Sequence, residues 1–265
     1  MPGKETYFNR ISQECIPAMV HKTKGIILRS VKFGETSLIV SILTELFGLQ
    51  SYLVNGVRTS SLKGSSKTAL FQPSAILDLV IYHQESKNLQ RLKEYSWNHL
   101  YQNIFSDVVT NAIALYMIEL LQKCLKQPEP NPELFFFMED ALNGLDQSNQ
   151  KMQANFPLFF ALHLAGFFGF RIDDNYSEKR NILDLQEGYF TEERPSHPHH
   201  LENPLSGISS DLLKIRQPAE LADLSLNRDM RRQLLIAYED FYSIHITGFT
   251  PLKTLPVLRT ILEEG

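Results

Sequence analysis

The chain has 265 residues and a formal net charge of −4; 43% of its residues are hydrophobic and 21% are charged. This is the composition of an ordinary globular protein, not of a disordered or collagen-like chain. The length fits one large domain or two modest ones. Two cysteines, Cys15 and Cys124, cannot form a disulfide framework or a four-thiolate zinc site, and they fit a reducing cytoplasm.

Residues 1–19 mix charged residues, proline and polar residues, without the apolar run of a signal peptide. We expect this leader to lie outside the fold and to be partly disordered, with Met19 as a candidate alternative start. The most apolar run of the chain, residues 156–170, is shorter than the about 20 residues that a membrane-spanning helix needs. No membrane association is therefore expected.

Residues 20–97 consist of short apolar runs separated by turn residues such as Gly34 and the pair Asn55-Gly56. Such runs, which leave no room for a crossover helix, predict a small closed β-barrel. A five-stranded OB (oligonucleotide/oligosaccharide-binding) barrel is the first interpretation, and an SH3-like barrel is the second. The expected strands are residues 25–29, 38–43, 49–54, 74–82 and 89–95.

The expected barrel is basic although the whole chain is acidic. Between Val20 and Val80 there are seven basic and three acidic residues, so this segment carries +4 and the rest of the chain carries −8. A local positive field indicates a site for an anionic polymer such as DNA. A solvated surface loop explains the cations of residues 58–67 equally well. The residues predicted to contact DNA are Arg29, Lys32, Arg58, Lys63 and Lys67 for the phosphates, and Tyr52 or Phe33 for base stacking.

Beyond Trp97 the spacing of apolar residues changes from about two to about 3.6, which predicts a helical domain over residues 98–265. On its helices, Cys124 and His163 are expected to be core or boundary residues, not a nucleophile or a metal ligand. The expected helices are residues 107–125 capped by Ser106, 131–144 capped by Asn131, 156–170, a long helix that begins at Asn227, and a short one within 250–262.

Three arginines, Arg228, Arg231 and Arg232, stand in the first turns of the long helix, where the helix dipole disfavours cations. Pairing with nearby carboxylates is the favoured interpretation, and an extension of the DNA path is the alternative. The carboxylates within reach in the sequence are Asp223, Asp229 and Glu239.

Three segments resemble a known family. The stretches GIILRSVKFGETSLIVSILTELFGLQSYLVNGVR, LFQPSAILDLVIY and FYSIHITGFTPLKTLPVL are similar to the RecO family of bacterial recombination mediators in DNA repair. The resemblance covers about Val20 to Leu258 and is strongest in the barrel. It implies an OB domain followed by a helical domain, and binding of single- and double-stranded DNA with strand annealing. It also implies partnership with RecR and single-strand-binding protein, in the cytoplasm at the nucleoid.

Residues 171–205 depart most from that family. Many relatives carry a four-cysteine zinc-binding element here, and this chain has no cysteine in the segment. His197, His199 and His200 form a cluster, but no carboxylate or cysteine stands at a recognisable ligand spacing, so neither a metal nor a cofactor is predicted. A short hairpin of residues 182–185 and 188–191 is the expected substitute.

The sequence lacks a phosphate-binding loop, a nucleophile elbow, a zinc-protease motif and a dinucleotide fingerprint. The chain is therefore predicted not to be an enzyme, and any annealing that it promotes must be passive, without ATP. Two hypotheses remain. In the first, the chain is a DNA-binding mediator that helps to load a recombinase with RecR. In the second, it is a protein-interaction adaptor whose basic barrel binds acidic partner segments without direct DNA contact.

Overall fold

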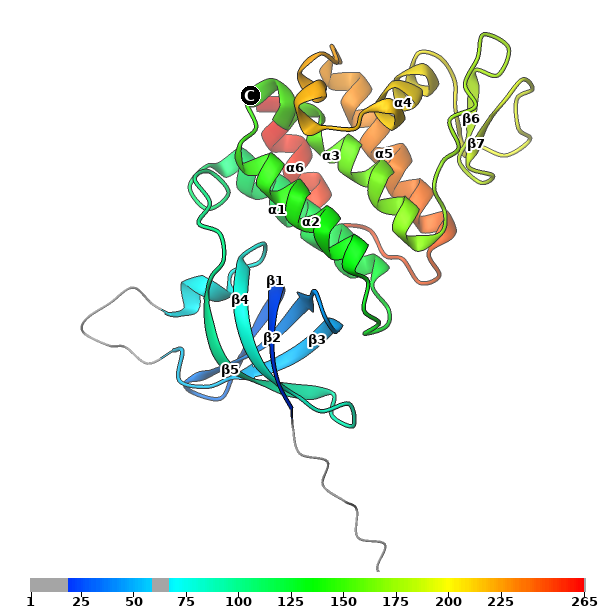
Figure 1. Cartoon of the computed structure of the whole chain (residues 1–265). Helices are drawn as coiled ribbons and strands as arrows, with labels where there is room; N and C mark the ends of the chain where they lie inside the picture. The colour runs from blue at the N-terminus through cyan, green and yellow to red at the C-terminus, as the bar shows by residue number, and fades with distance from the viewer. Residues whose placement is uncertain (1–18, 59–66, 265) are drawn as a thin grey trace, which may run out of the picture.

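The computed structural model describes residues 19–58 and 67–264. A β-barrel forms one end of the molecule and a bundle of helices the other, with a small sheet at the edge of the bundle (Figure 1). The expected leader up to residue 18, which includes Cys15, and the predicted contact residue Lys63 lie outside the described residues. Met19, the last residue of the expected leader, already belongs to the first barrel strand.

The barrel closes in the strand order β1-β2-β3-β5-β4, and β4 pairs back onto β1. Its neighbouring strands are antiparallel except β3 and β5, which are parallel. This arrangement confirms the predicted five-stranded OB-type barrel in place of the SH3-like alternative. The strands are β1 (Met19–Phe33), β2 (Ser37–Thr44), β3 (Gly48–Val54), β4 (Ile76–His83) and β5 (Leu89–Trp97), with a 3-10 turn η1 (Lys67–Phe71) before β4.

Alternating side chains fill the barrel. In β2, Leu38, Val40 and Ile42 are buried in its interior, and the residues between them are half-buried. Gly25 of β1 also faces inward, where an added Cβ would lie 2.5 Å from Leu79 Cδ1. The glycine thus leaves room in the interior for the side chains of Leu79 and Ile42. Since side chains occupy the interior, a ligand meets the outer surface and the rim of the barrel.

Four helices of the helical domain, α1, α2, α3 and α5, begin at a side-chain cap. Asn131 and Asn227 cap α2 and α5 as predicted, because their side-chain oxygens accept the N–H groups of Leu134 at 3.0 Å and Met230 at 2.8 Å. Among the described residues, no helix combines the length and the apolar character that crossing a membrane requires. The helices are α1 (Val108–Cys124), α2 (Pro132–Asp146), α3 (Gln150–Ala165), α4 (Leu205–Lys214), α5 (Arg228–His245) and α6 (Thr254–Glu264), with 3-10 turns η2 (Gly166–Phe168) and η3 (Pro218–Ala222).

Two helix starts differ from the expectation. The cap of α1 is Asp107 and not Ser106, because the Asp107 carboxylate accepts the Thr110 N–H at 2.8 Å. The helix α3 begins at Gln150 rather than at residue 156, because Asn149 caps a polar first turn that a search for apolar runs passes over. In both helices a side-chain cap sets the first residue, Asp107 for α1 and Asn149 for α3.

The irregular segment folds into a small sheet of strand order β7-β6-β8. The strands β6 (Ile182–Asp184) and β7 (Tyr189–Thr191) form the predicted hairpin, with Gly188 in its turn at a φ of +72°. The third strand, β8 (His200–Leu201), was not predicted, since two residues beside prolines carry no periodic pattern. The helix α4 that follows was also missed.

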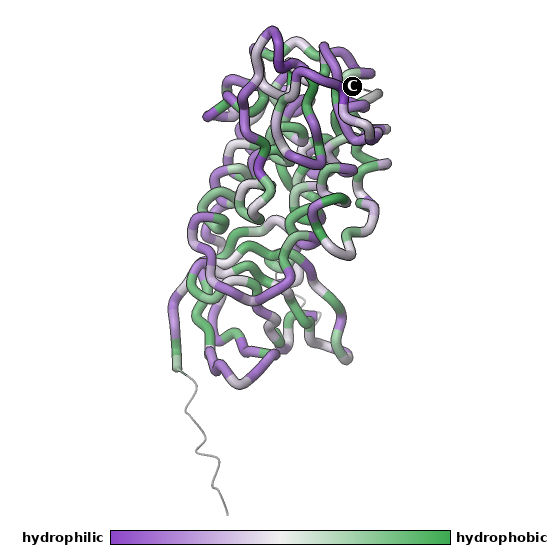
Figure 2. The backbone as a smooth tube through the Cα atoms, turned by 90° about the vertical axis from the view of Figure 1, so that its right-hand side faces the viewer, coloured by the Kyte–Doolittle hydropathy of each residue, from purple (hydrophilic) through white to green (hydrophobic). Residues whose placement is uncertain are grey.

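The barrel and the helices share one hydrophobic core. Ile26, Leu28, Leu43 and Ile76 of the barrel pack with buried residues of the helical domain. Hydrophobic segments accordingly gather inside the molecule from the barrel into the bundle (Figure 2). The side-chain amide of Gln122 on α1 also donates to the carbonyl of Leu28. The barrel is therefore fixed on the helical domain by apolar packing as well as by polar contacts.

Candidate nucleic-acid interface

Two of the predicted phosphate contacts, Arg29 and Lys32, are exposed on the second half of β1. Arg29 lies opposite Ser41 on β2, whereas Lys32 lies opposite Leu38, which is buried in the barrel. Because directly opposed residues share a face of a sheet, Arg29 lies on the outer face and Lys32 at the rim. Neither side chain forms an ion pair or a hydrogen bond with another described residue. Both cations are therefore available to a ligand.

Of the remaining predicted cations, Arg58 lies near the β1–β2 turn and Lys67 lies in η1. The Arg58 guanidinium donates from Nη1 to the Gly34 carbonyl at 2.9 Å, so it ties the segment after β3 to that turn. Lys67 is exposed at the start of η1. Lys63 lies outside the described residues, and its contact stays a prediction. Arg58 thus already has a hydrogen-bond partner within the fold. The ammonium group of Lys67 forms no ion pair or hydrogen bond with another described residue.

Tyr52 lies inside the barrel with an exposed fraction of 0%. The prediction that it offers a stacking surface is wrong, because the register of β3 places it opposite Val40, which is also buried. Burial raises the pKa of the Tyr52 hydroxyl well above its usual value. Phe33, the alternative, is 51% exposed at the end of β1 and stays a candidate.

Part of the positive charge of the barrel belongs to the domain boundary. Lys24 Nζ lies 2.8 Å from Glu139 Oε1 and 3.1 Å from Glu139 Oε2 on α2. The hydrogen bond with Glu139 raises the pKa of Lys24. Glu139 is 9% exposed, and Lys24 compensates the negative charge of this largely buried carboxylate. Lys24 therefore serves the fold, and the sequence-based charge count overstates what faces a ligand.

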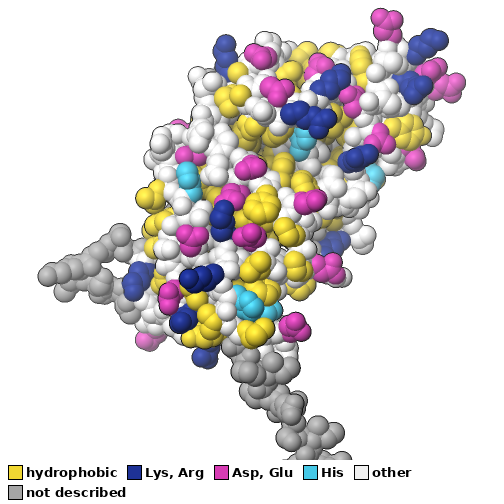
Figure 3. Space-filling model, in the orientation of Figure 1, with side chains coloured by type: hydrophobic (Ala, Val, Ile, Leu, Met, Phe, Trp, Pro, Cys, Tyr) yellow, Lys and Arg dark blue, Asp and Glu magenta, His cyan; other side chains and the backbone are white. Residues whose placement is uncertain are grey.

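The β4–β5 hairpin carries cations that the sequence-based prediction missed. Lys87 and Arg91 lie beside Tyr82 at a surface groove of about 640 Å³. The charge count that identified the barrel as basic ended at Val80, so it left out the β4–β5 turn with Lys87 and the last strand with Arg91. In Figure 3, Lys and Arg side chains lie beside hydrophobic ones over the barrel. We name this site the hairpin groove; its lining residues are Leu53, Tyr82, Gln84, Lys87, Leu89, Gln90 and Arg91.

A second cationic site, which we name the α3–α5 groove, lies on the helical domain. Lys151, Arg228 and Arg231 line this groove of about 590 Å³ together with apolar residues. Asn155, 2% exposed, donates from Nδ2 to two backbone carbonyls, and its Oδ1 has no partner in the described part of the chain. Burial and the neighbouring charge of Arg228 lower the pKa of Arg231. Cations beside apolar surface suit a peptide segment that carries carboxylates.

Of the arginines at the start of α5, Arg232 pairs as predicted, with Nη2 3.1 Å from Asp229 Oδ1. Arg231 instead donates from Nη1 to the Leu226 carbonyl at 2.6 Å. Glu239 is not their partner, because it accepts a backbone N–H from the segment before α6 at 2.6 Å. The prediction of carboxylate pairing therefore holds for one arginine of this group.

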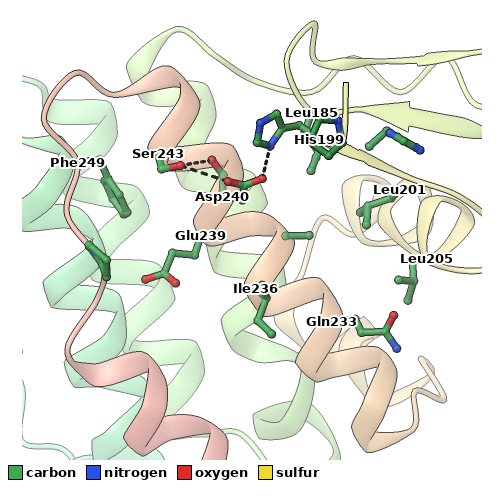
Figure 4. A pocket seen from close by; sticks show the side chains of 14 residues that line it. Leu185, His199, Leu201, Leu205, Gln233, Ile236, Glu239, Asp240, Ser243 and Phe249 are labelled. Carbon is green, nitrogen blue, oxygen red and sulfur yellow. Dashed lines mark hydrogen bonds and ion pairs between the residues drawn. The ribbon is translucent and has the colours of Figure 1, made fainter. Parts of the chain in front are cut away.

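The histidines of the small sheet pair with carboxylates. His199 Nδ1 lies 2.5 Å from Asp240 Oδ2 on α5, and His197 Nε2 lies 3.2 Å from Asp184 Oδ2. In the pocket of Figure 4, the Ser243 hydroxyl donates to Asp240 and not to His199. These three residues therefore do not form a catalytic triad. Within residues 19–58 and 67–264, no group of three or more His, Cys, Asp or Glu is placed to hold a metal ion.

His163 and Cys124 have the structural roles expected of them. His163 Nε2 lies 3.3 Å from the Leu212 carbonyl, and burial lowers the pKa of the ring, so the imidazole is neutral at neutral pH. Cys124 is 5% exposed, and burial raises the pKa of its thiol. A buried thiol of raised pKa is a poor nucleophile, which fits a packing role.

Two family models match consecutive parts of the chain. The model of the recombination protein O N terminal matches residues 19–101, and the model of the recombination protein O C terminal matches residues 106–256. The two matches coincide with the barrel and with most of the helical domain. The chain belongs to the RecO family.

Curated members of the RecO family align along nearly the whole chain. The DNA repair protein RecO of Flavobacterium johnsoniae is 34% identical over 249 residues, which cover 91% of this chain and 99% of that protein. The same protein of Flavobacterium psychrophilum is 32% identical over 250 residues, with 91% and 99% covered. That of Bacteroides fragilis is 30% identical over 248 residues, with 92% and 100% covered. The resemblance seen in the sequence is confirmed, and the chain is a member of a DNA repair and recombination family.

Proposed function

We propose that this chain is a non-enzymatic recombination mediator in DNA repair. It binds single- and double-stranded DNA, anneals complementary strands and helps to load a recombinase together with RecR. The observation that carries this proposal is a set of cations on an OB barrel that have no partner within the described residues: Arg29, Lys32, Lys67 and Arg91. Phosphate binding depends on such unneutralised cations, because each contact releases counterions from the DNA. Membership of the RecO family supports the same function.

Passive annealing needs no catalytic group. Two complementary strands repel each other through their phosphates, and a cationic surface that binds both strands reduces this repulsion. Arg29 on the outer face and Lys32 at the rim offer contacts on two sides of the same strand. The bases stay accessible for pairing as long as the main contacts are made to the backbone.

RecR and single-strand-binding protein are the proposed protein partners. The α3–α5 groove supports the second of these, because Lys151, Arg228 and Arg231 attract carboxylates and the apolar lining accepts a hydrophobic side chain. The proposed binding of single-strand-binding protein at this groove leaves the barrel cations open to DNA. We expect the protein to act in the cytoplasm, at the nucleoid.

An annealing assay without ATP tests this proposal. Two complementary oligonucleotides that carry a donor and an acceptor dye report pairing by energy transfer. The barrel variant combines Arg29→Ala, Lys32→Ala and Lys67→Ala. The control variant combines Arg171→Ala, Arg180→Ala and Arg194→Ala, which removes the same charge from ion-paired arginines of the helical domain.

The wild type is expected to accelerate annealing, the barrel variant to lose most of this acceleration and the control variant to keep it. No acceleration by the wild type, or an equal loss in both variants, would contradict the proposal.

A protein-interaction adaptor is the second candidate, because the barrel also exposes apolar side chains. Met19, Val20 and Val31 are 64%, 50% and 44% exposed. An adaptor that binds acidic partner segments would show no affinity for DNA even at low salt. DNA binding with a steep salt dependence would therefore exclude this candidate as the main function.

A further inference from the structure

The strand register of the barrel sets an aromatic, a cationic and an apolar side chain in one row on its outer surface. Tyr82 of β4 lies directly opposite Arg91 of β5, and Arg91 lies opposite Leu53 of β3. Ile81, the neighbour of Tyr82, is 0% exposed and faces the interior, so Tyr82 faces outward. Tyr82 is 37% exposed, and the row borders the hairpin groove.

The two cations of this groove have no carboxylate partner in the described part of the chain. Neither the Arg91 guanidinium nor the Lys87 ammonium forms an ion pair or a hydrogen bond with another described residue. On the same strand, Lys93 is by contrast paired with Glu94 at 3.7 Å. Glu85 belongs to the same hairpin but does not line the groove. Unneutralised cations beside an exposed aromatic ring are the combination that binds single-stranded nucleic acid.

One buried side chain holds the turn that carries Lys87. Gln90 is 3% exposed, and its Oε1 accepts the Gln84 N–H at 3.0 Å. Its Nε2 donates to the carbonyls of Gln84 at 2.8 Å and Lys87 at 2.7 Å. The Lys87 N–H also donates to the Gln84 carbonyl at 3.0 Å. A turn fixed by four hydrogen bonds presents Lys87 with little further loss of backbone conformational entropy on binding.

We infer that the hairpin groove is a single-strand subsite, in which Tyr82 stacks on an unpaired base while Arg91 and Lys87 contact the adjoining phosphates. The inference rests on the proposed DNA binding and adds a strand preference to it. In a duplex each base is covered by its neighbours, so its face is closed to Tyr82. The groove therefore favours single strands, whereas Arg29 and Lys32 bind the backbone of either form. Its volume, about 640 Å³, lies within the usual range of ligand sites.

Fluorescence anisotropy of the full chain with three labelled DNAs tests the inference. The probes are a thymine-only single strand, an abasic strand with the same number of phosphates, and a duplex. The variants are Tyr82→Ala and Tyr82→Phe. Tyr189→Ala is the matched control, since Tyr189 is 42% exposed on a strand of the small sheet.

Tyr82→Ala is expected to weaken binding of the thymine strand about 10-fold, because stacking contributes to each bound base, and to change binding of the duplex and the abasic strand by less than about twofold. Tyr82→Phe, which keeps the ring, and Tyr189→Ala should bind like the wild type. Arg91→Ala should lower the slope of log affinity against log salt by about 0.7 for the single strand.

The outcomes separate this inference from the proposed function. If the wild type binds DNA with a salt-dependent affinity and Tyr82→Ala binds the thymine strand equally well, the subsite is refuted and the proposed function stands. An equal loss on the abasic strand or on the duplex also refutes it. If Tyr82→Ala keeps its DNA affinity but no longer binds purified RecR, the subsite is refuted and the groove is a protein-docking surface. If the wild type binds no DNA, both proposals fail.

Discussion

The barrel and the helical domain use their charged side chains in opposite ways. On the barrel, Arg29, Lys32 and Arg91 are exposed and have no ion pair with another described residue. In the helical domain, the carboxylates of Asp146 and Glu119 accept backbone N–H groups where elements meet. The first arrangement leaves charge for a ligand, and the second uses charge to hold the fold.

The number of charges in a segment therefore says less about ligand binding than the partners of those charges do. Lys24 belongs to the basic barrel, yet its charge is matched by Glu139 at the domain boundary. Lys151 and Arg228 belong to the acidic remainder of the chain, yet they line an open groove. Substitutions that remove paired and unpaired charges should therefore affect different properties: the first stability, the second binding.

The largest effect on stability is expected from Asp146→Ala. Asp146, 2% exposed, accepts the N–H groups of Gln102, Asn103 and Ile104 at 2.8 to 2.9 Å and so fixes the connection between the barrel and α1. Removal of the carboxylate leaves three backbone donors without an acceptor, and the one at Ile104 is buried, so the loss is expected to be about 3 kcal/mol. Urea unfolding measures this loss; a loss below about 1 kcal/mol would show that the connection is not held in this way.

A smaller effect is expected from Glu119→Gln. The Glu119 carboxylate accepts the N–H groups of Lys253 and Thr254 at 3.0 and 2.8 Å and the Thr254 hydroxyl at 2.7 Å. Burial acts to raise the pKa of Glu119, but these hydrogen bonds outweigh it and lower the pKa. The variant should lose about 2 kcal/mol at neutral pH, because one acceptor oxygen becomes a donor.

The pH dependence sharpens this test. A carboxyl group whose pKa is lower in the folded state stabilises the protein above its unfolded pKa and loses this contribution as pH falls through the folded pKa. The difference in unfolding free energy between the wild type and Glu119→Gln should therefore shrink in acid. Asp140→Asn, on the exposed part of α2, is the control for the loss of a surface carboxylate and should change the free energy of unfolding at neutral pH by less than about 0.5 kcal/mol. A difference that is constant with pH would argue against the charged acceptor.

Asp107→Ala should cost about 1 kcal/mol, the usual contribution of a helix N-cap. Asp107 accepts the Thr110 hydroxyl at 2.6 Å and its N–H at 2.8 Å, and these hydrogen bonds lower the pKa of Asp107. The effect is therefore present above the unfolded pKa and fades as pH falls through the lower folded value. Ser106→Ala alters the residue predicted as the cap, and it should change the free energy of unfolding in urea by less than about 0.5 kcal/mol. A larger loss from Ser106→Ala than from Asp107→Ala would show that Ser106 is the cap.

The smallest effect on stability is expected from the barrel variant with Arg29→Ala, Lys32→Ala and Lys67→Ala. Exposed side chains without partners change the free energy of unfolding by about 0.5 kcal/mol or less. Lys24→Ala should be more destabilising than these three together, since it leaves Glu139 buried without its cation. If the barrel variant proved the less stable of the two in thermal unfolding, its cations would have structural partners after all.

The barrel could be predicted well because its turn residues and the alternation of buried and exposed residues along each strand are both visible in short stretches of sequence. Asn55-Gly56 ends β3, and the alternation of β2 sets Leu38, Val40 and Ile42 inside. What sequence could not provide is the register between strands. A shift of one residue decides whether Tyr52 or its neighbours face outward, and the cross-strand pairing places Tyr52 inside.

The candidate site was predicted only in part for a similar reason. The exposure of Arg29, Lys32 and Lys67 agrees with the sequence-based expectation, and their contact with DNA stays a prediction. The pairing of Lys24 with Glu139 joins residues 115 positions apart, and no local pattern reveals it. The hairpin groove depends on Arg91 lying between Tyr82 and Leu53, which follows from the parallel pairing of β3 and β5.

The most direct measurement is the salt dependence of single-strand affinity for the wild type, the barrel variant and the control variant with Arg171→Ala, Arg180→Ala and Arg194→Ala. Loss of three phosphate contacts should make the slope of log affinity against log salt shallower by about 2 in the barrel variant and leave the slope of the control variant unchanged. Equal slopes in all three proteins would contradict the central claim that the unpaired cations of the barrel hold DNA.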